Sequence, residues 1–358
     1  MSPCSTSTPD RHSLRRILRS LLLICLSCAL VACGDGPVLQ QESFVFGTRV
    51  EVVTQGAPEA QARDAIAAVL REFDRLHRTY HAWQPSELTN LNQALARSEA
   101  ASVTPEMLGL IQSALTYAEQ GDHLFDPAIG NLIQLWGFHT DTFVARVPDP
   151  EALRKLIAAQ PRMSDLQIKG NQVSSRNPAV ALDFGGIAKG WALDKAAAIL
   201  HEHGIHNALI NIGGNVMALG SKGQQPWTVG IQHPRNSGPL ATLALYDGEA
   251  IGTSGDYQRF FDLDGRRYSH LLDPRNGEPA RHTQAVTVLI TPRANAGMLS
   301  DVASKPVFLA GKEWREMARR FNVSHVLRVD EAGKITLSTD MRARLRWAQG
   351  VEPGEVLE

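Results

Sequence analysis

Apolar residues recur with helical spacing over two segments in the first third of the chain. Residues 58–76 place alanine, valine, leucine and phenylalanine side chains on one side of a helix. Residues 103–121 add capping signals, because Thr104 can cap the first turn, a proline follows it, and Gly121 ends the periodic run. The pattern therefore predicts a helix over each segment.

Alternation of apolar and polar residues, which is typical of strands, occupies much of the remaining chain. It covers 44–56 and 208–212, and it continues from 227 to 290 with DLDG and DPRNG as turns. Helical spacing returns after Pro150 and over 190–203. Clustered strands with flanking helices predict an α+β fold with mixed or antiparallel sheets.

The stretch SDVASKPVFLAG, at 300–311, combines helical apolar spacing with a lysine and a proline. Pro306 removes a backbone donor and clashes one turn back, which costs about 3 kcal/mol inside a helix, so we expect the helix to kink or stop there. Lys305 would be a buried lysine that needs a partner. The segment is therefore either an ordinary helix end or the edge of a site.

The first residues have the features of a targeting signal. Four arginines precede the apolar run LLLICLSCALVAC, which has the order of a secretory signal and is short for a membrane span. The run ends in LVACG, which resembles the bacterial lipobox, where the chain is cut before a cysteine that becomes acylated. We expect a lipoprotein signal peptide over 1–32, a lipid on Cys33 and a tether over 33–42; a plain signal peptide or an uncleaved anchor is the alternative.

The positions of the cysteines and the net charge exclude some kinds of site and partner. The cysteines are Cys4, Cys25, Cys28 and Cys33, so a mature chain would have no disulfide and no thiolate metal site. Loss of 1–32 would remove four of the 36 basic and one of the 37 acidic residues, which moves the net charge from −1 to about −4. That balance gives no basic surface for nucleic acid, and none is expected as a partner.

The segment ALDFGGIAKGWALDKAAAILHEHGI, at 181–205, is the most informative about chemistry. A strand delivers Asp183, the pair Gly185 and Gly186 lets backbone approach a ligand closely, and a helix begins near Lys189. Amide groups at a helix start attract anions, and an adjacent lysine favours phosphate. Tight packing of a strand–turn–helix unit is the alternative.

Other glycine and polar clusters follow at irregular spacing. NIGGNV, at 211–216, is typical of a hairpin turn. Ser254, Gly255 and Asp256 need more explanation, because a turn does not require a hydroxyl, a bare backbone and a carboxylate together. His270 lies in a strand pattern, where a lone histidine is more often structural.

The order of several motifs, taken together, is distinctive. They are FGT, WQPSEL with Asn92, FDPAIGNLIQLWGF, LDFGGIAKGWALD, NIGGNV, TSGDY, YSHLLDPRNGEP and the helix with Asp301 before FLAG. This order resembles the ApbE family, the FAD:protein FMN transferases once described as thiamine biosynthesis lipoproteins. The resemblance implies an ApbE-like α+β domain over 43–358, and the lipobox agrees with it.

The resemblance implies an enzyme that binds FAD and Mg²⁺ and moves the FMN half of FAD onto a threonine, with release of AMP. Such a reaction needs anion stabilisation, a hard cation and a group that takes a proton. By the resemblance, Lys189 would serve the pyrophosphate, and Asp301 with the Gly186 carbonyl would hold Mg²⁺. His270 would be the base, and an ordinary histidine pKa near 6.5 suits that role.

The resemblance also implies contacts to the flavin nucleotide. Phe46 stands where methionine is usual, and Asn276 replaces a usual threonine. The aromatic residue before SEL lies one position closer than usual, so either Tyr80 or Trp83 would stack on the ligand. The other implied contacts are Leu124, Phe125, Asp126, Asp183, Lys189, Ser254, Gly255, Asp256 and Leu271.

The departure with the largest consequence is Lys305, which stands where the resembling motif has a metal-binding threonine. Mg²⁺ accepts water in place of a hydroxyl, and Lys305 could swing outward, so one interpretation is an active transferase. A protonated lysine cannot ligate a metal, however, and its ammonium could pair with Asp301. A flavin-binding lipoprotein without transfer, or an FAD pyrophosphatase, are the alternatives. The presence of Asp183, Lys189 and His270 favours transfer.

The resemblance implies an acceptor protein at a membrane. It would be a subunit of a sodium-pumping NADH:quinone oxidoreductase, of an Rnf-type complex, or another periplasmic flavoprotein. We expect the protein to be lipid-anchored on the periplasmic face of the inner membrane. The outer membrane is the alternative, because the residues after Cys33 do not decide the sorting.

Overall fold

The computed structural model describes residues 36–140 and 142–357. The expected signal peptide and Cys33, the cysteine expected to carry a lipid, lie outside the described residues. Within these two ranges, none of the helices is both long enough and apolar enough to span a membrane.

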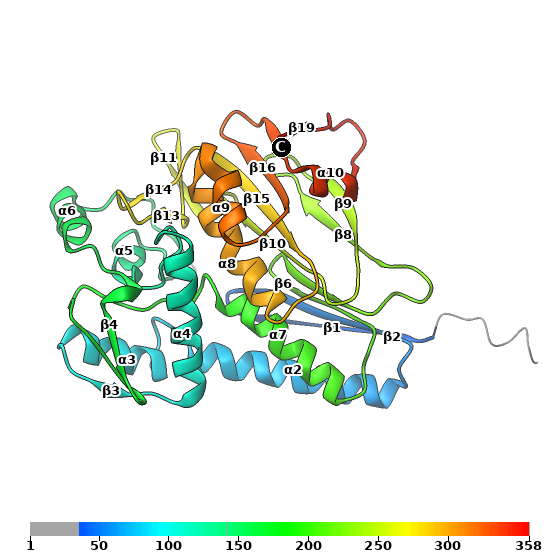
Figure 1. Ribbon diagram of the computed structural model, residues 1–358, viewed down its shortest axis with the longest axis horizontal. Helices are drawn as coiled ribbons and strands as arrows, with labels where there is room; N and C mark the ends of the chain where they lie inside the picture. The colour runs from blue at the N-terminus through cyan, green and yellow to red at the C-terminus, as the bar shows by residue number, and fades with distance from the viewer. Residues whose placement is uncertain (1–35, 141, 358) are drawn as a thin grey trace, which may run out of the picture.

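A nine-stranded sheet runs through the centre of the described part of the molecule (Figure 1). Neighbouring strands run antiparallel, except for the last two, which run parallel. In the order in which they pair, the strands are β1 (Val38–Val45), β2 (Thr48–Gln55), β6 (Ala208–Ile212), β7 (Asn215–Leu219), β10 (Ala250–Gly255), β15 (Thr283–Ile290), β16 (His325–Asp330), β17 (Ile335–Leu337) and β19 (Glu355–Val356).

Smaller sheets and the helices surround this sheet. The small sheets, in pairing order, are β3 (Ala101–Ser102) with β5 (Gln172–Ser175) and β4 (Leu166–Lys169), β18 (Leu345–Trp347) with β9 (Pro239–Leu245) and β8 (Trp227–Gln232), β11 (Phe260–Leu263) with β12 (Arg266–Ser269), and β13 (Leu272–Asp273) with β14 (Glu278–Pro279). The helices are α2 (Glu59–Thr79), α3 (Glu87–Ala96), α4 (Pro105–Gln120), α5 (Gly130–Leu135), α6 (Pro150–Ala159), α7 (Ala188–Glu202), α8 (Ala296–Leu309), α9 (Trp314–Arg320) and α10 (Thr339–Arg344).

Both faces of the central sheet are covered, because its middle strands carry apolar side chains on both sides. In β15, Val286 and Val288 join the core formed with α2, α7 and α8. Ala285 and Leu289, which alternate with them, join a second core with β8 and β9. The sheet is thus the middle layer of three, and α8 is buried against it (Figure 1).

Most predicted elements are confirmed. The helices expected over 58–76, 103–121 and 190–203 are α2, α4 and α7, and the strand over 208–212 is β6. Thr104 caps α4 as predicted, because its hydroxyl accepts the N–H of Met107 at 3.2 Å. The antiparallel sheets with flanking helices confirm the predicted α+β class.

The start of the described chain differs from the prediction. Residues 38–42, expected in a tether, belong to β1, whose full length pairs with β2. The segment 44–56, expected as one strand, contains a two-residue hairpin loop. Phe46 and Gly47 form it, with φ of 57° and 66°. Two-residue hairpin loops usually contain Asn-Gly, Asp-Gly or Gly-Gly, and a phenylalanine rarely adopts the left-handed conformation. The loop was therefore not predicted from the sequence.

The helix expected to stop or kink at Pro306 instead continues to Leu309. Every residue of α8 except Lys305 is buried, so tertiary packing outweighs the lost hydrogen bond. The carbonyl of Pro306 still accepts the N–H of Ala310 at 2.8 Å. The segment is therefore a buried helix, and Lys305 is its one side chain with partial access to solvent.

Candidate active site

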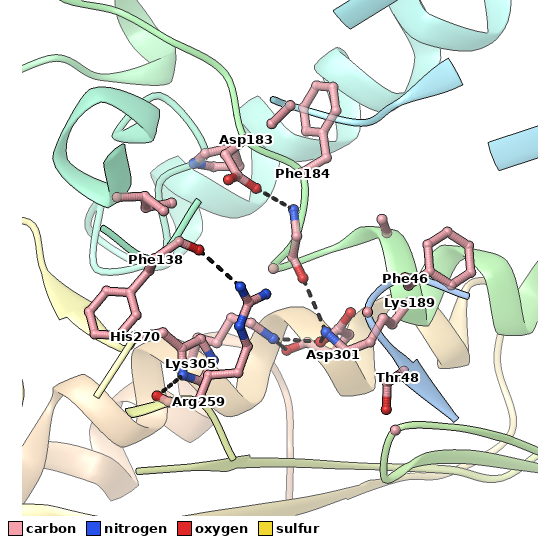
Figure 2. A pocket seen from close by; sticks show the side chains of 18 of the residues that line it. Phe46, Thr48, Phe138, Asp183, Phe184, Lys189, Arg259, His270, Asp301 and Lys305 are labelled. Carbon is pink, nitrogen blue, oxygen red and sulfur yellow. Dashed lines mark hydrogen bonds and ion pairs between the residues drawn. The ribbon is translucent and has the colours of Figure 1, made fainter. Parts of the chain in front are cut away.

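A cavity of about 1030 Å³ opens where the β1–β2 hairpin tip, the Gly185–Gly186 turn and α8 meet. Its volume is enough for a dinucleotide-sized ligand. The predicted residues that line it are Phe46, Tyr80, Trp83, Leu124, Phe125, Asp126, Asp183, Gly186, Lys189, Ser254, His270, Leu271 and Asp301. Segments far apart in the sequence are thus brought to one site, as Figure 2 shows.

Two predicted residues lie away from this cavity. Asp256 forms a bidentate ion pair with Arg235, with both N–O distances at 2.7 Å. Gly255 is explained by packing, because a Cβ there would lie 2.3 Å from the ring of Tyr257. Of the TSGD segment, whose first three residues end β10, Thr253 and Ser254 line the cavity. Ser254 shares a 2.8 Å hydrogen bond with Ser304.

Asp301, on α8, is the buried anion at the floor of the cavity. Its side chain is 1% exposed, and its Oδ2 accepts the N–H of Gly190 at 2.9 Å. Its Oδ1 accepts from the ammonium of Lys305 at 2.5 Å, and the ammonium of Lys189 lies 3.9 Å from the same atom. Burial opposes ionisation, but the two lysine charges and these hydrogen bonds outweigh it, so the pKa of Asp301 is lowered.

The bond between Asp301 and Gly190 depends on close contact between α7 and α8. A Cβ on Gly190 would lie 2.3 Å from the carbonyl oxygen of Gly297, which no side chain can tolerate. Asp194, also on α7, accepts the N–H groups of Gly297 and Met298 at 2.8 Å each. These bonds satisfy amide groups at the start of α8 and hold the two helices together.

Asp183 and Lys189 lie at the two ends of the Gly–Gly turn. The Asp183 carboxylate accepts the N–H of Gly185 at 2.7 Å, and the Lys189 ammonium donates to the Gly185 carbonyl at 3.1 Å (Figure 2). Burial raises the pKa of Asp183, although the Gly185 N–H opposes the shift. The strand expected before Asp183 is wrong, because this segment forms only an isolated bridge between Ala181 and Ile129. Asn92 holds it instead, since its amide pairs with both backbone groups of Leu182 at 2.7 and 2.9 Å.

His270 follows β12 and faces the cavity. Its Nδ1 lies 3.1 Å from the carbonyl oxygen of Arg259, and because a carbonyl can only accept, Nδ1 carries the proton. Nε2 is then the unprotonated nitrogen. Burial and the charges of Arg259 and Lys189 lower the pKa of His270 to about 3. The imidazole is therefore neutral over the physiological range, which differs from the ordinary pKa expected from the sequence.

Arg259 is a cavity residue that the motif analysis did not single out. Its guanidinium donates to the carbonyls of Phe138 at 2.9 Å and Thr140 at 3.2 Å, and its own carbonyl holds His270. In the sequence it lies four residues after Gly255, just beyond the TSGDY motif. Nothing in the sequence shows that this side chain, rather than Asp256, faces the cavity.

Aromatic side chains also line the cavity. Phe46 packs against Phe73 and His77, with ring centroids 6.0 and 5.8 Å apart. Tyr80 is 7% exposed, and its hydroxyl donates to Glu106 at 3.0 Å. Trp83 lines the cavity and is more exposed than Tyr80, which makes it the better candidate for stacking on a ligand.

Asp126 reaches the cavity, but its carboxylate is used within the protein. It accepts the N–H groups of Ala128 and Met163 at 3.0 Å each, and it lies 2.6 Å from Nδ1 of His123. The carboxylate thus holds the loop before α5. Any contact from this segment to a ligand would come from its backbone or from Leu124 and Phe125.

The residues present do not fit the Mg²⁺ site that the resemblance implies. The Lys305 ammonium donates to both the carbonyl and the carboxylate of Asp301, and a Cβ on Gly186 would lie 3.2 Å from Lys305 Cε. The lysine therefore lies between the two expected ligands. Across the described ranges, no group of three or more His, Cys, Asp or Glu side chains is arranged to hold a metal ion.

Several known proteins are similar to this chain in sequence. A FAD:protein FMN transferase of Rhodobacter capsulatus is 41% identical over 361 residues, which cover 99% of this chain and 68% of that protein. A FAD:protein FMN transferase of Treponema pallidum is 31% identical over 315 residues, 82% of this chain and 85% of that protein.

Solved structures agree with these sequence relatives. The ApbE protein of Thermotoga maritima superposes with a TM-score of 0.78 at 32% identity, covering 87% of this chain and 100% of that one. The flavin transferase ApbE of Vibrio cholerae superposes with a TM-score of 0.75 at 26% identity, with coverage of 87% and 100%. The predicted ApbE-like fold is confirmed. A model of the ApbE family matches residues 46–327, and the chain belongs to that family.

Proposed function

We propose that this protein is an FAD:protein FMN transferase, which moves FMN from FAD to a hydroxyl group of another protein. The observation that carries the proposal is the lining of the cavity, where an unprotonated histidine nitrogen, a cluster of cations and aromatic side chains are brought together. The names of the relatives support the same activity.

The reaction is a displacement at phosphorus. The acceptor oxygen attacks the phosphorus of the FMN half of FAD, and a new P–O bond forms. The bond from that phosphorus to the bridging oxygen breaks, and AMP leaves with the bridging oxygen. The hydroxyl proton moves to a base. No electrons are transferred, so the flavin keeps its oxidation state.

His270 is the proposed base, acting through Nε2. Its Nδ1–H bond to the Arg259 carbonyl fixes the tautomer, so Nε2 faces the cavity without a proton. The pKa of His270 is about 3 in the absence of a ligand because of burial and nearby cations. An anionic pyrophosphate would offset those cations and raise the pKa of His270, so the imidazole becomes a stronger base when FAD is bound.

The charges around the cavity suit a diphosphate. Lys189, Lys305 and Arg259 contribute three positive charges, and Asp126, Asp183 and Asp301 are the carboxylates that line the same cavity. The Asp126 carboxylate is used by hydrogen bonds within the protein, and burial raises the pKa of Asp183. The three cations can therefore attract an anionic ligand and stabilise the charge that develops on the leaving phosphate. Because Lys305 occupies the expected metal position, no step of this proposal is assigned to Mg²⁺.

The aromatic residues that line the cavity suit the flavin ring. Phe46 is held at the hairpin tip in a left-handed conformation, and strain of this kind persists where the surrounding structure enforces it. Together with Trp83 it offers apolar ring faces against which a planar ligand can stack. The ring would lie at the mouth, and the diphosphate over Lys189.

The acceptor and the cellular location belong to the same proposal. By the resemblance, the target hydroxyl is a threonine of a periplasm-facing redox protein, such as a subunit of a sodium-pumping NADH:quinone oxidoreductase or an Rnf-type complex. An acyl chain on Cys33 would hold the enzyme at the periplasmic face of a membrane, close to such an acceptor.

In-gel flavin fluorescence tests the proposed function. The purified protein is incubated with FAD and a candidate acceptor, and the mixture is separated under denaturing conditions. A fluorescent acceptor band supports transfer, and an acceptor variant with the threonine replaced by valine should give none. Release of free FMN and AMP without a band would instead identify an FAD pyrophosphatase. Bound FAD without either product would identify a flavin-binding protein.

A further inference from the structure

Lys305 is the one partly accessible side chain of a helix that is otherwise buried. Its ammonium donates to the Asp301 carbonyl at 2.7 Å and to the Asp301 carboxylate at 2.5 Å. The stem of the side chain lies beside the backbone of Gly186, at the turn where an anion would be bound. The ammonium is thus held on two sides and faces the cavity on a third (Figure 2).

We propose that the ammonium of Lys305 replaces the divalent cation at this site, so that the protein binds FAD and transfers FMN without Mg²⁺. The inference rests on the proposed function, because it concerns how that site neutralises the diphosphate.

Charge supports this role. A lysine ammonium has three donors, and Asp301 uses two of those on Lys305, which leaves one for a phosphate oxygen. The Lys189 ammonium lies 3.9 Å from the same carboxylate oxygen. Two ammonium groups therefore meet at one carboxylate, and together they carry the charge of one divalent ion.

A divalent cation would have to compete with Lys305 for the Asp301 carboxylate. A divalent cation could reach the Asp301 carboxylate only if Lys305 gave up both hydrogen bonds. The displaced ammonium would then lie close to the incoming ion, because its helix is fixed by burial and its stem is enclosed by the cavity wall. Repulsion between those charges is strong where solvent screening is weak.

A metal ion and an ammonium group interact with phosphate oxygens in different ways. A metal ion accepts lone pairs from phosphate oxygens, whereas an ammonium donates hydrogen bonds to them. The Lys305 ammonium is part of the protein chain and is held in position by Asp301, so it does not have to bind from solution as a metal ion does. FAD affinity should therefore be independent of divalent cation concentration.

The first test compares FAD binding in EDTA and in excess Mg²⁺, measured on the purified protein by quenching of flavin fluorescence. We expect dissociation constants that agree within about twofold. Lys305→Thr replaces the ammonium with a hydroxyl oxygen that can ligate a metal ion. This variant should bind FAD about tenfold or more weakly in EDTA, and its FAD affinity should recover in Mg²⁺. Lys334→Thr is the matched control, because it removes an exposed lysine that pairs with Glu355 at 2.6 Å and does not line the cavity.

A second test needs no FAD. Mg²⁺ is titrated calorimetrically into the wild type and into Lys305→Thr. We expect binding only in the variant, and we expect Asp301→Asn in that background to abolish it. A wild type whose FAD affinity falls about tenfold in EDTA would overturn the inference, as would Mg²⁺ binding that Asp301→Asn removes from the wild type. These wild-type measurements decide the matter even if a Lys305 variant does not fold.

The two proposals fail in different ways. If FAD binds equally in EDTA and in Mg²⁺ but no acceptor is labelled, transfer is wrong and the role of Lys305 in binding stands. If labelling occurs only with Mg²⁺, transfer stands and the role of Lys305 is wrong.

Discussion

At the scale of single residues, His270 owes its proposed role to one backbone carbonyl. The Arg259 carbonyl accepts from Nδ1, which leaves Nε2 as the nitrogen that can take a proton. The same segment supplies the Arg259 guanidinium, which lowers the pKa of His270 together with burial. Tautomer and charge state are therefore set by neighbours that the YSH motif does not include.

Replacement of His270 tests this role directly. His270→Ala should lower the rate of FMN transfer by about 10²- to 10⁴-fold, the usual contribution of a positioned base, and should leave FAD affinity within about tenfold. Transfer rate and FAD binding are measured separately. His206→Ala, at an exposed position that packs near His201, is the control. Equal losses of rate and affinity would show that His270 positions the nucleotide.

The pH profile offers an independent test. A base must be unprotonated to act, and a lowered pKa keeps His270 unprotonated to a lower pH than usual. We therefore expect kcat/KM, which reports on the free enzyme, to stay level from about pH 8 to about pH 5. A histidine with its ordinary pKa would instead give a roughly tenfold fall per pH unit below about 6.5, and that result would contradict the structure around His270.

At the scale of elements, the site depends on how closely α7 and α8 approach. Gly190 and Gly297 make room for each other's backbone, and this contact brings the Gly190 N–H to Asp301. The sequence places Gly190 at the start of a predicted helix, whereas Gly297 lies before the segment with helical spacing at 300–311. It does not show that two glycines more than a hundred positions apart are in contact, because that follows from tertiary packing.

A pair of glycine substitutions separates packing from helix propensity. Gly190→Ala should lower the free energy of unfolding by about 1–3 kcal/mol, because its Cβ would overlap the Gly297 carbonyl. Gly109→Ala, in α4, has no atom within 4 Å of the added Cβ and should raise stability by up to about 1 kcal/mol. Urea unfolding measures both. A stabilising Gly190→Ala would contradict the close contact between the helices.

Elements with strong local signals were predictable from the sequence. The cap at Thr104 and the periodic apolar residues of α4 depend on neighbours within one or two turns. The β1–β2 hairpin was missed because Phe46 adopts a conformation that its own side chain disfavours. The continuation of α8 past Pro306 was missed because burial of the whole helix outweighs a local penalty.

At the scale of the whole molecule, the cavity is built where parts of the chain far apart in sequence meet. The hairpin tip with Phe46, the turn at Gly186 and the helix with Asp301 come from separate thirds of the chain. The motifs identified most of the lining residues, because each motif has a recognisable local form. The pairing of Lys305 with Asp301, one of the alternatives raised from the sequence, is confirmed. The motifs did not identify Arg259 as a cavity residue.

Membrane attachment is a prediction about the chain as a whole. Cys33→Ser should release the protein from the membrane fraction and leave FAD affinity unchanged, because the cavity is formed by residues from 44 onward. Fractionation and mass spectrometry of the native protein measure this. Retention of Cys33→Ser in the membrane after cleavage, or a native protein without lipid mass, would contradict the lipobox interpretation.

The most direct test of the central claim is the intact mass of an acceptor protein after incubation with this enzyme and FAD. FMN transfer predicts an added mass equal to FMN minus one water, located on a threonine by fragmentation, with one AMP released for each acceptor modified. An unchanged acceptor mass, with FAD either intact or fully hydrolysed to FMN and AMP, would contradict the account.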